Sequence, residues 1–341
     1  MKIKENYSLL KHNTFGLDVK TRWFVEYESE EDILKLLSDE YFLSQPYFHI
    51  GSGSNLLFLE DFGGIILHSG ISGLEIIAEN EEFADIKAGS GMKWDDFAAY
   101  CVDKGWGGTE NLSLIPGEVG AAAVQNIGAY GAEVRDLIRE VHTYDTDTHE
   151  KKIFQNRDCS FSYRYSIFKE NEYAGRYIIT HVVFRLSKNP LCNIDYGNLK
   201  TGIPEGAEIT PAEVRKAVIG VRESKLPDPK KIGNAGSFFM NPYLTMTDYE
   251  ALKKEYSSVP HYPVSEDRVK VPAAWLIDQC GLKGKTVGNA GIHENQPLVI
   301  INKGGASGSE IALLAEEVKQ TVMQKFGIEL KPEVHYVGLL W

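Results

Sequence analysis

The spacing of apolar and polar residues changes several times along the first half of the chain. ESEEDILKLLSDEYF has helical spacing with Ser29 as its N-cap, and YFHIGSGSN predicts a strand that runs into a glycine–serine turn. Residues 61–90 read as short strands separated by glycine. Residues 92–104 place their apolar side chains on one helical face, and Gly105 ends that helix. After a turn-rich stretch, EVHTYDTD, KKIFQ and RYIITHVVFRL predict further strands.

The second half of the chain predicts longer helices. Thr210 is a suitable N-cap, Pro211 fits the first helical position and Glu213 completes a capping box. PAAWLIDQCG predicts another helix. The last helix is SEIALLAEEVKQTVMQKFG, with Ser309 as its cap and Gly327 at its end, and LKPEVHYVG predicts a terminal strand. We expect an α+β protein divided into an N-terminal segment 1–20, a first domain 21–188, a connector 189–209 and a second domain 210–341.

Composition and charge narrow the class of protein. The 341 residues are 43% hydrophobic and 25% charged, as in ordinary soluble proteins, and 36 basic against 48 acidic residues give a net charge of −12. This charge disfavours nucleic acid or an anionic membrane as a partner, but permits a local basic pocket. The four cysteines form no C-x-x-C motif, so we expect free thiols and no metal site. MKIKENYSLLKHNTF has no signal-peptide core, so a cytoplasmic protein is expected.

Two glycine-rich stretches are candidates for ligand binding. GSGSN, residues 51–55, offers backbone N–H groups and short polar side chains to a phosphate. It lacks the third glycine of a dinucleotide fingerprint, however, and taken alone it fits a plain turn better. LIPGEVGAAAVQNIGAYG, residues 114–131, has little charge and many small residues. It suits a backbone wrapped around a flat ligand, or a tightly packed turn between elements.

Four further stretches carry candidate chemistry. SFSYRYSIFK predicts a strand with Phe161, Tyr163 and Tyr165 on one face, so Arg164 points away as a surface ion-pair partner or as a fixed cation for a carboxylate. VRESKLPDPKK gathers basic residues at a helix end, either to complement the helix dipole or to bind a diphosphate. GNAGSFFMNP holds Ser237 without the second glycine of a hydrolase elbow. In LKPEVHYVG, Glu333 lies on the polar face, as a solvated residue or as a general acid.

Taken together, these motifs resemble the UDP-N-acetylenolpyruvoylglucosamine reductase family. The resemblance extends from about Asn13 to Gly338 and rests on IGSGSNLLF, ENLSLIPGEVGAAAVQNIGAYG, FSYRYSIFK, KLPDPKKIGNAGSFFMNP, WLIDQCGLKG and PEVHYVG, in the family's order. YGNL, residues 196–199, resembles the loop of the subgroup that places a tyrosine over the substrate. The resemblance implies a FAD-binding domain of the vanillyl-alcohol-oxidase (PCMH) type, with two α+β subdomains, and a C-terminal α+β substrate-binding domain.

The resemblance also implies a reaction and roles for individual residues. NADPH reduces a non-covalently bound FAD, and hydride then adds to C3 of the enolpyruvyl ether of UDP-N-acetylglucosamine. Ser237 would protonate C2, while Arg164 and Glu333 would stabilise the enolate. The implied cofactor-binding residues are Gly51, Ser52, Gly53, Ser54, Asn55, Pro116, Gly117, Gly120, Ala121, Gln125, Asn126, Gly128, Ala129, Tyr130 and Gly131. The implied substrate-binding residues are Tyr163, Tyr196, Arg222, Lys225, Asn241, Tyr262, Lys283 and Gln296.

The chain departs from the family pattern at three positions. Ala121 and Ala122 stand where the enterobacterial type has serines, and Met240 replaces a lysine, so individual contacts are lost. Two alternatives stay open: another FAD oxidoreductase of the same superfamily, such as an alcohol or hydroxy-acid oxidase, or a non-catalytic flavin- or nucleotide-sugar-binding relative. We expect a monomer whose partners are small molecules only.

Overall fold

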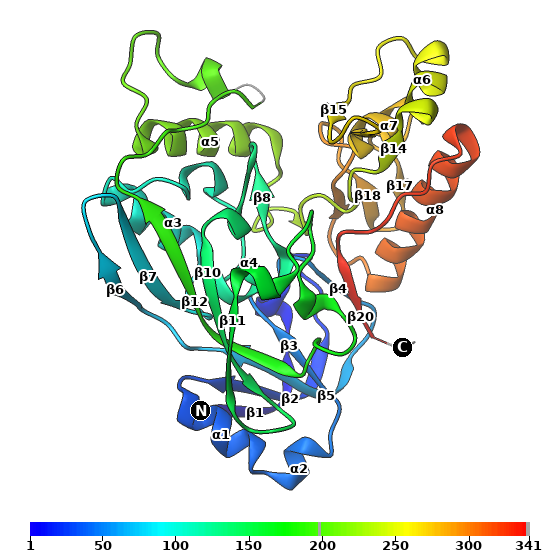
Figure 1. Cartoon of the computed structure of the whole chain (residues 1–341). Coiled ribbons are helices and arrows are strands. Elements are labelled where there is room, and N and C mark those ends of the chain that lie inside the picture. Colours follow the sequence, from blue (N-terminus) through cyan, green and yellow to red (C-terminus); the bar gives the residue numbers. More distant parts are fainter. Residues whose placement is uncertain (197–198, 339–341) are drawn as a thin grey trace. The chain divides into compact units, whose positions relative to one another are not determined.

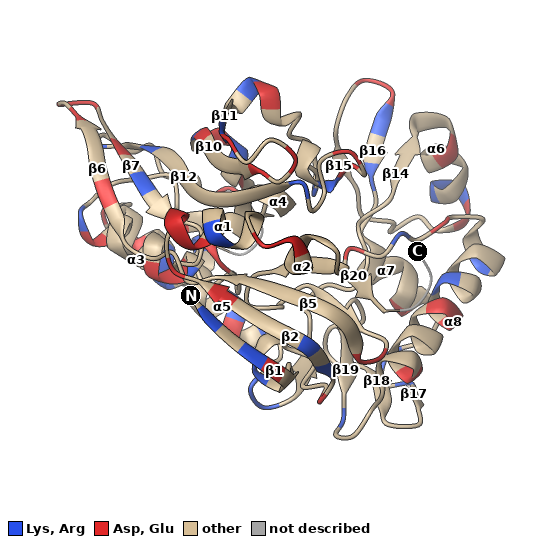
Figure 2. Ribbon diagram, turned by 90° about the horizontal axis from the view of Figure 1, so that it is seen from below, with Lys and Arg blue, Asp and Glu red and all other residues tan. Residues whose placement is uncertain are grey.

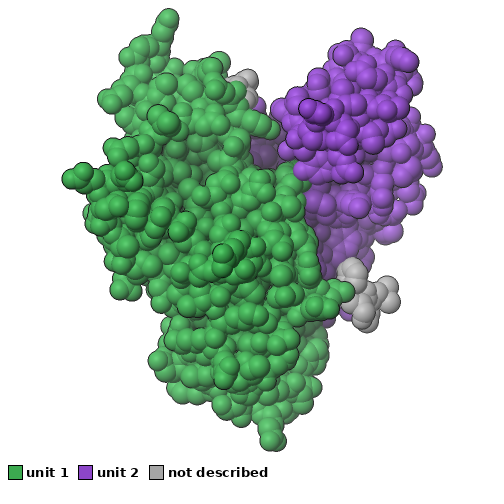
Figure 3. Space-filling view, viewed as in Figure 1, with its two compact units in different colours: residues 1–7, 21–52, 62–224 green, residues 8–20, 53–61, 225–341 purple. Residues whose placement is uncertain are grey.

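The computed structural model describes residues 1–196 and 199–338, which form two compact units (Figure 3). The first unit contains residues 1–7, 21–52 and 62–224, and the second contains residues 8–20, 53–61 and the chain from residue 225 onward. Two short segments of the N-terminal half therefore complete the second unit. The GSGSN motif is divided, because Ser52 ends a segment of the first unit and Gly53 begins one of the second.

A four-stranded sheet in the first unit has the order β1-β2-β5-β3 (Figure 1). Its strands are β1 (Lys2–Ser8), β2 (Lys20–Tyr27), β5 (Phe62–Ser69) and β3 (Tyr47–Ile50), and β5 pairs in parallel with both β2 and β3. Between β2 and β3 the chain forms α1 (Glu30–Leu37) and α2 (Glu40–Leu43). The Ser29 hydroxyl accepts a hydrogen bond from the Asp32 N–H at 3.3 Å, which confirms the predicted N-cap.

The five-stranded sheet of the first unit is antiparallel and has the order β11-β10-β12-β7-β6. Its strands are β11 (Lys151–Gln155), β10 (Ile138–Asp145), β12 (Tyr177–Ser187), β7 (Phe83–Gly89) and β6 (Leu74–Glu79). The helix α3 (Trp94–Asp103) contributes the fully buried Trp94 and Phe97, whose rings contact Phe184 of β12. The predicted helix over 92–104 is confirmed, and Gly105 follows it with a φ of +76°.

One helix of the first unit has no counterpart in the sequence prediction. The sequence predicts a turn-rich stretch around residues 105–133, whereas the structure contains α4 (Val119–Gln125) there, followed by the hairpin β8 (Gly128–Ala129) and β9 (Ala132–Glu133). Small residues give this segment a weak helical pattern. They also let it pack closely, because a Cβ added to Gly120 would lie 2.9 Å from the Ser90 Cβ. Tertiary packing therefore decides the conformation here.

The last helix of the first unit is α5 (Pro211–Lys225), of which only the final residue, Lys225, is counted in the second unit, and its predicted cap is present. The Thr210 hydroxyl accepts a hydrogen bond from the Glu213 N–H at 3.3 Å. The buried Val214 and Val218 pack with Leu199 in a small apolar cluster.

Short 3₁₀ helices lie in both units, at Leu10–His12, Glu110–Leu112, Val134–Asp136, Asn156–Cys159, Ile167–Lys169 and Leu199–Gly202.

The second unit contains small sheets and three α-helices among its described residues. One antiparallel sheet contains β13 (Gly233–Asn234), β19 (Ile300–Asn302), β18 (Ala290–Ile292) and β17 (Thr286–Val287). Another contains β14 (Tyr243–Thr245), β16 (Arg268–Lys270) and β15 (Tyr262–Pro263), while β4 (Leu56–Phe58) pairs in parallel with β20 (His335–Val337). The helices are α6 (Met246–Glu255), α7 (Ala273–Gln279) and α8 (Gly308–Phe326).

The start of α8 corrects the sequence prediction. The N-cap is Ser307 rather than Ser309: its hydroxyl accepts from the Glu310 N–H at 3.1 Å, and the Glu310 carboxylate accepts from the Ser307 N–H at 2.7 Å. Only Ser307 has a glutamate three residues later, so only this serine can form the reciprocal capping box. Gly327 ends the helix with a φ of +68°, as predicted.

Charged residues are spread over both units. Acidic positions, in red, and basic positions, in blue, are scattered along the ribbon over both helices and strands (Figure 2). Within residues 1–196 and 199–338, no helix is both long enough and apolar enough to cross a membrane.

Candidate active site

Ser237 follows a turn that a buried asparagine organises. Asn234, 4% exposed, donates hydrogen bonds to the carbonyls of Pro227 (3.1 Å) and Ile232 (2.9 Å), and its side-chain oxygen accepts from the Gly236 N–H at 2.9 Å. Gly236 has a φ of +69°, which favours glycine. The backbone on either side of Asn234 is thereby fixed, and the half-buried Ser237 follows at once.

The small and aromatic residues around Ser237 also have structural roles. A Cβ added to Gly233 would lie 2.1 Å from the Phe15 carbonyl oxygen, so the close approach that Gly233 makes is to the chain's own backbone. Phe238 and Phe239 are buried, and the Phe238 ring contacts those of Phe15 and Tyr336. The two phenylalanines therefore support the turn by packing.

Glu333 lies on the segment that pairs with the one following Ser237. Its N–H donates to the Phe238 carbonyl at 2.8 Å, and the Met240 N–H donates to the Lys331 carbonyl at 2.9 Å. The Asn55 side chain donates to the Glu333 carbonyl at 3.0 Å, and the Asn55 carbonyl accepts from the His335 N–H at 2.9 Å. One hydrogen-bonded network of the second unit therefore joins the end of the GSGSN motif to both candidate catalytic residues of this unit.

Arg164 belongs to the first unit, and the predicted strand around it is wrong. Ser162 and Tyr165 exchange two backbone hydrogen bonds of 3.0 Å, so Tyr163 and Arg164 form the tip of a tight turn. Arg164 has a φ of +56°. Its guanidinium donates to the Gly128 carbonyl at 2.8 Å and lies 5.1 Å from the Tyr163 ring centroid, so the two side chains meet instead of pointing apart.

The 114–131 motif supports this turn through its polar residues. The fully buried Asn126, with a φ of +46°, donates to the Ser162 carbonyl at 2.7 Å and to the Glu133 carboxylate at 3.1 Å. Lys169 donates to the Gln125 side chain at 2.9 Å and to the Arg164 carbonyl at 3.0 Å. Gln125 and Asn126, predicted as cofactor-binding residues, therefore also hold the Arg164 turn.

Tyr196 packs on the end of the same motif. Its ring lies edge-on to that of Tyr130, with the centroids 6.5 Å apart, and Asn111 donates to the carbonyls of both Tyr130 and Asn193 at 2.9 Å. Residues 197–198 of the predicted tyrosine loop lie outside the described residues.

Sequence reasoning missed an ion pair that anchors α5, the helix of Arg222. The Arg215 guanidinium binds both oxygens of the Asp95 carboxylate, at 2.7 and 3.0 Å, and Asp95 also accepts from the Leu114 N–H. The Nε atom of Arg222 is buried and has no partner in the described part of the chain, and burial lowers the pKa of Arg222. A buried guanidinium with an unused donor is suited to an anionic ligand. No periodicity signals such a pair, since its members are 120 positions apart.

The other predicted substrate residues belong to the second unit and have varied surroundings. Lys225 is exposed, and Tyr262 is 41% exposed on β15. The Asn241 side chain accepts from the Ala273 N–H at 2.9 Å at the start of α7. Lys283 forms an ion pair with Asp278 at 2.9 Å, and the Gln296 carbonyl accepts from the Val299 N–H at 3.0 Å.

The first half of the GSGSN motif leaves an unused polar atom. The Ser52 hydroxyl is buried and has no hydrogen-bond partner among the described residues. A Cβ added to Gly51 would lie 3.2 Å from the Ala121 Cβ, so the loop and the start of α4 meet closely. A buried hydroxyl without a partner beside a glycine is suited to an oxygen-rich ligand such as a diphosphate.

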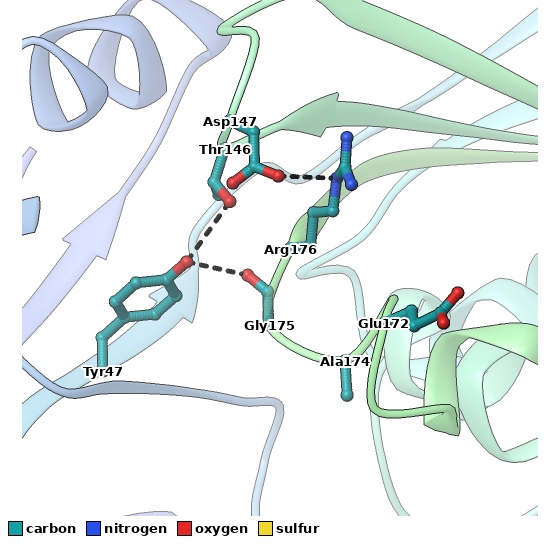
Figure 4. Close-up of a pocket in the computed structure, with 7 residues that line it drawn as sticks. All are labelled: Tyr47, Thr146, Asp147, Glu172, Ala174, Gly175 and Arg176. Carbon is teal, nitrogen blue, oxygen red and sulfur yellow. Dashed lines mark hydrogen bonds and ion pairs between the residues drawn. The ribbon is translucent and has the colours of Figure 1, made fainter.

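A polar pocket of about 510 Å³ lies elsewhere in the first unit (Figure 4). Tyr47 donates to the Gly175 carbonyl at 3.0 Å, and Arg176 is paired with Asp147 at 3.2 Å and with Asp145 at 2.8 Å. The charge of Arg176 is thus balanced by the two aspartates. None of the predicted site residues lines this pocket. The described residues also contain no cluster of His, Cys, Asp or Glu able to hold a metal ion.

Two family models match the chain. The model for the C-terminal domain of UDP-N-acetylenolpyruvoylglucosamine reductase matches residues 228–337, and a FAD-binding domain model matches residues 21–151. Proteins named UDP-N-acetylenolpyruvoylglucosamine reductase are similar over nearly the full length. The one from Bacteroides fragilis is 48% identical, covering 98% of this chain and 100% of its own, and the one from Porphyromonas gingivalis is 49% identical, covering 99% and 100%.

A solved structure has the same fold. The crystal structure of the UDP-N-acetylenolpyruvylglucosamine reductase from Thermus caldophilus superimposes with a TM-score of 0.68 at 20% identity, and covers 99% of this chain and 100% of its own. The expected α+β architecture, a FAD-binding domain followed by a second domain, is confirmed by this likeness together with the family models.

Proposed function

This chain belongs to the UDP-N-acetylenolpyruvoylglucosamine reductase family, and we propose that it uses NADPH and FAD to reduce UDP-N-acetylglucosamine enolpyruvate to UDP-N-acetylmuramate for peptidoglycan synthesis. The observation that carries this proposal is the 48% identity to the Bacteroides fragilis relative over 98% of the chain. That a monomer performs the reaction in the cytoplasm stays a prediction.

The residues around the first half of GSGSN fit a FAD diphosphate. Gly51 leaves room at the loop, and the partnerless Ser52 hydroxyl is a donor for a phosphate oxygen. We propose that backbone N–H groups of the loop and of the 114–131 motif bind the cofactor without a covalent bond. Ala121 has no side-chain donor, so the backbone supplies the hydrogen bonds at that position.

Bound FAD, once NADPH has reduced it, would supply the hydride that adds to C3 of the enolpyruvyl group. The addition leaves negative charge at C2, and the neighbouring carboxylate shares it. Arg164 is proposed to hold these oxygens, because its guanidinium is already oriented by the Gly128 carbonyl and the Tyr163 ring. Glu333 is proposed to donate a hydrogen bond to the same carboxylate, which requires that it carry a proton at that step.

Ser237 is proposed to give its hydroxyl proton to C2, which completes the lactyl ether. A carbon next to a carboxylate becomes a strong base after hydride addition, so a neutral hydroxyl is a sufficient acid and needs no histidine partner. The turn held by Asn234 fixes the backbone before Ser237, and the bond from Glu333 to the Phe238 carbonyl fixes the backbone after it. The donor is thus held in place before the substrate arrives.

The remaining predicted residues are proposed to bind the UDP-sugar. Arg222 offers its unused guanidinium donor to a phosphate, and Lys225 follows it one helical turn later at the end of α5. Tyr196 is proposed to cover the bound substrate. Tyr163, Asn241, Tyr262, Lys283 and Gln296 complete the proposed substrate site.

A turnover assay tests the proposal directly. Purified protein is mixed with NADPH and UDP-N-acetylglucosamine enolpyruvate, and the NADPH absorbance is followed. We expect oxidation of NADPH only when the enolpyruvyl substrate is present. A protein that carries no flavin and oxidises no NADPH under these conditions would refute the proposed function.

The same preparation separates the alternatives. A flavin-dependent oxidase would form peroxide in air without the enolpyruvyl substrate. A non-catalytic relative would bind flavin or a UDP-sugar and give no turnover of NADPH. Each result is distinct from that expected of the reductase.

A further inference from the structure

A buried carboxylate faces the loop that is proposed to bind the FAD diphosphate. Glu118, in the IPGEVG part of the motif, is 7% exposed and belongs to the first unit. One of its oxygens contacts the Nε2 atom of His68 at 3.0 Å. The other would lie 3.3 Å from a Cβ added to Gly51. A negative charge at this place would repel an anionic cofactor unless a cation balances it.

His68 is the group that can balance this charge. It lies on β5 with a side chain that is 12% exposed, and its Nδ1 atom contacts the Glu26 carboxylate at 3.1 Å. Glu26 is itself paired with the exposed Lys2 at 3.0 Å. The imidazole therefore lies between the carboxylates of Glu26 and Glu118, and Lys2 compensates part of the negative charge of Glu26. Both ring nitrogens can donate only when the ring is protonated.

The neighbouring groups favour the protonated ring. Burial alone lowers the pKa of His68, but the hydrogen bonds and charges of Glu118 and Glu26 outweigh burial, and the pKa is raised. On β3, burial and then the charge of His68 lower the pKa of His49 to about 4, so His49 is neutral. Tyr27, on β2, is also neutral, because burial raises its pKa far above the physiological range. Glu118 is thus balanced by His68.

We propose that His68 is a positioning residue that neutralises Glu118, so that the FAD diphosphate can occupy the loop at Gly51 and Ser52. This inference rests on the proposed function, because it assumes that FAD binds at this loop. It goes beyond that function by assigning a role to His68 and Glu118, neither of which is among the predicted site residues. The role is electrostatic: His68 acts through Glu118 and need not touch the cofactor.

The test measures FAD affinity of the purified holoprotein, separately from activity. A dilution series is brought to equilibrium, and the rise in flavin fluorescence gives the dissociation constant for FAD. His68→Gln keeps a hydrogen-bond donor but removes the charge, and we expect it to weaken FAD binding by about 10- to 100-fold. The double variant His68→Gln/Glu118→Gln removes both charges and should bind FAD within about threefold of the wild type.

A matched control comes from the same unit. His142 contacts Glu140 at 2.8 Å on β10, a strand that carries none of the predicted site residues, and His142→Gln should leave FAD affinity unchanged. The wild type should release FAD more readily as the pH rises above the raised pKa of His68, while Glu118→Gln should lose most of this dependence. The single Glu118→Gln variant keeps the inference testable if His68→Gln does not fold.

Three outcomes would overturn the inference. Unchanged FAD affinity in His68→Gln would show that the charge is not needed. A double variant as weak as His68→Gln would show that His68 acts through packing. An unaltered pH dependence in Glu118→Gln would exclude Glu118 as the group that His68 balances. In all three the wild type still binds FAD, whereas a wild type that binds no FAD would refute the proposed function itself.

Discussion

The turns that carry Arg164 and Ser237 belong to different units, yet a buried asparagine holds each of them. Asn126 donates to the Ser162 carbonyl at the start of the Arg164 turn, and Asn234 accepts from the Gly236 N–H just before Ser237. The turns differ in where the left-handed residue lies. Before Ser237 it is a glycine, with a φ of +69°, whereas in the other turn it is Arg164 itself, with a φ of +56°.

This difference has an energetic consequence. A left-handed conformation costs a non-glycine residue about 1–2 kcal/mol, so the Arg164 turn has a cost that the Ser237 turn avoids. The contacts of Arg164 with the Gly128 carbonyl and the Tyr163 ring offset part of it. A strained conformation at a residue whose side chain is held by such contacts indicates that the position of this guanidinium matters.

The largest expected loss of activity comes from a change in the Ser237 turn. Ser237→Ala removes the proposed proton donor without changing the backbone, so reoxidation of reduced flavin by the enolpyruvyl substrate should slow by about 10²- to 10⁴-fold. Reduction of the flavin by NADPH should stay nearly unchanged. Stopped-flow measurements of the two half-reactions check this, and equal slowing of both would contradict the assignment of Ser237 as the proton donor.

Removing the side chain of the strained turn should separate activity from stability. Arg164→Gly should slow the substrate half-reaction by about 10²- to 10³-fold, because the cation at the developing charge is lost. The free energy of unfolding should stay the same or rise by up to about 1 kcal/mol, because glycine accepts the left-handed conformation. Urea unfolding beside stopped-flow kinetics tests both parts. A large loss of stability would mean that the contacts of Arg164 outweigh its strain.

The two turns also show what the sequence could predict. The Ser237 turn was predictable in part, because glycine, asparagine and a pair of phenylalanines mark a turn backed by packing. The strand predicted at Arg164 failed since alternating aromatic residues can flank a two-residue turn as well as line one face of a strand. Asp95 and Arg215 gave no signal, because their ion pair depends on the tertiary fold. Local spacing therefore predicted most helices and the motifs, but not the contacts that hold the motifs in place.

Removing the two asparagines compares the turns directly. Asn126→Ala should cost about 3 kcal/mol of unfolding free energy, because it leaves buried partners unsatisfied and also places alanine at a φ of +46°. Asn234→Ala should cost about 2 kcal/mol, from lost hydrogen bonds alone. Urea unfolding measures both. Asn126→Gly is the control. Because glycine accepts a positive φ, this variant should be about 1 kcal/mol more stable than Asn126→Ala. If the two variants are equally stable, backbone strain does not contribute to the loss.

The smallest expected effect distinguishes the conformation of the Ser237 turn from its chemistry. Gly236→Ala should cost about 1 kcal/mol of stability, since alanine is strained at a φ of +69° although nothing lies within 4 Å of an added Cβ. Gly327, at the end of α8, has a φ of +68° and equally open surroundings, so Gly327→Ala should cost the same. Only Gly236→Ala should also slow reoxidation of the flavin by substrate, by a few fold, because it shifts the backbone that carries Ser237. Equal kinetics in the two variants would show that Ser237 keeps its position when the preceding turn is strained, and that the bond from Glu333 to the Phe238 carbonyl is sufficient to hold it.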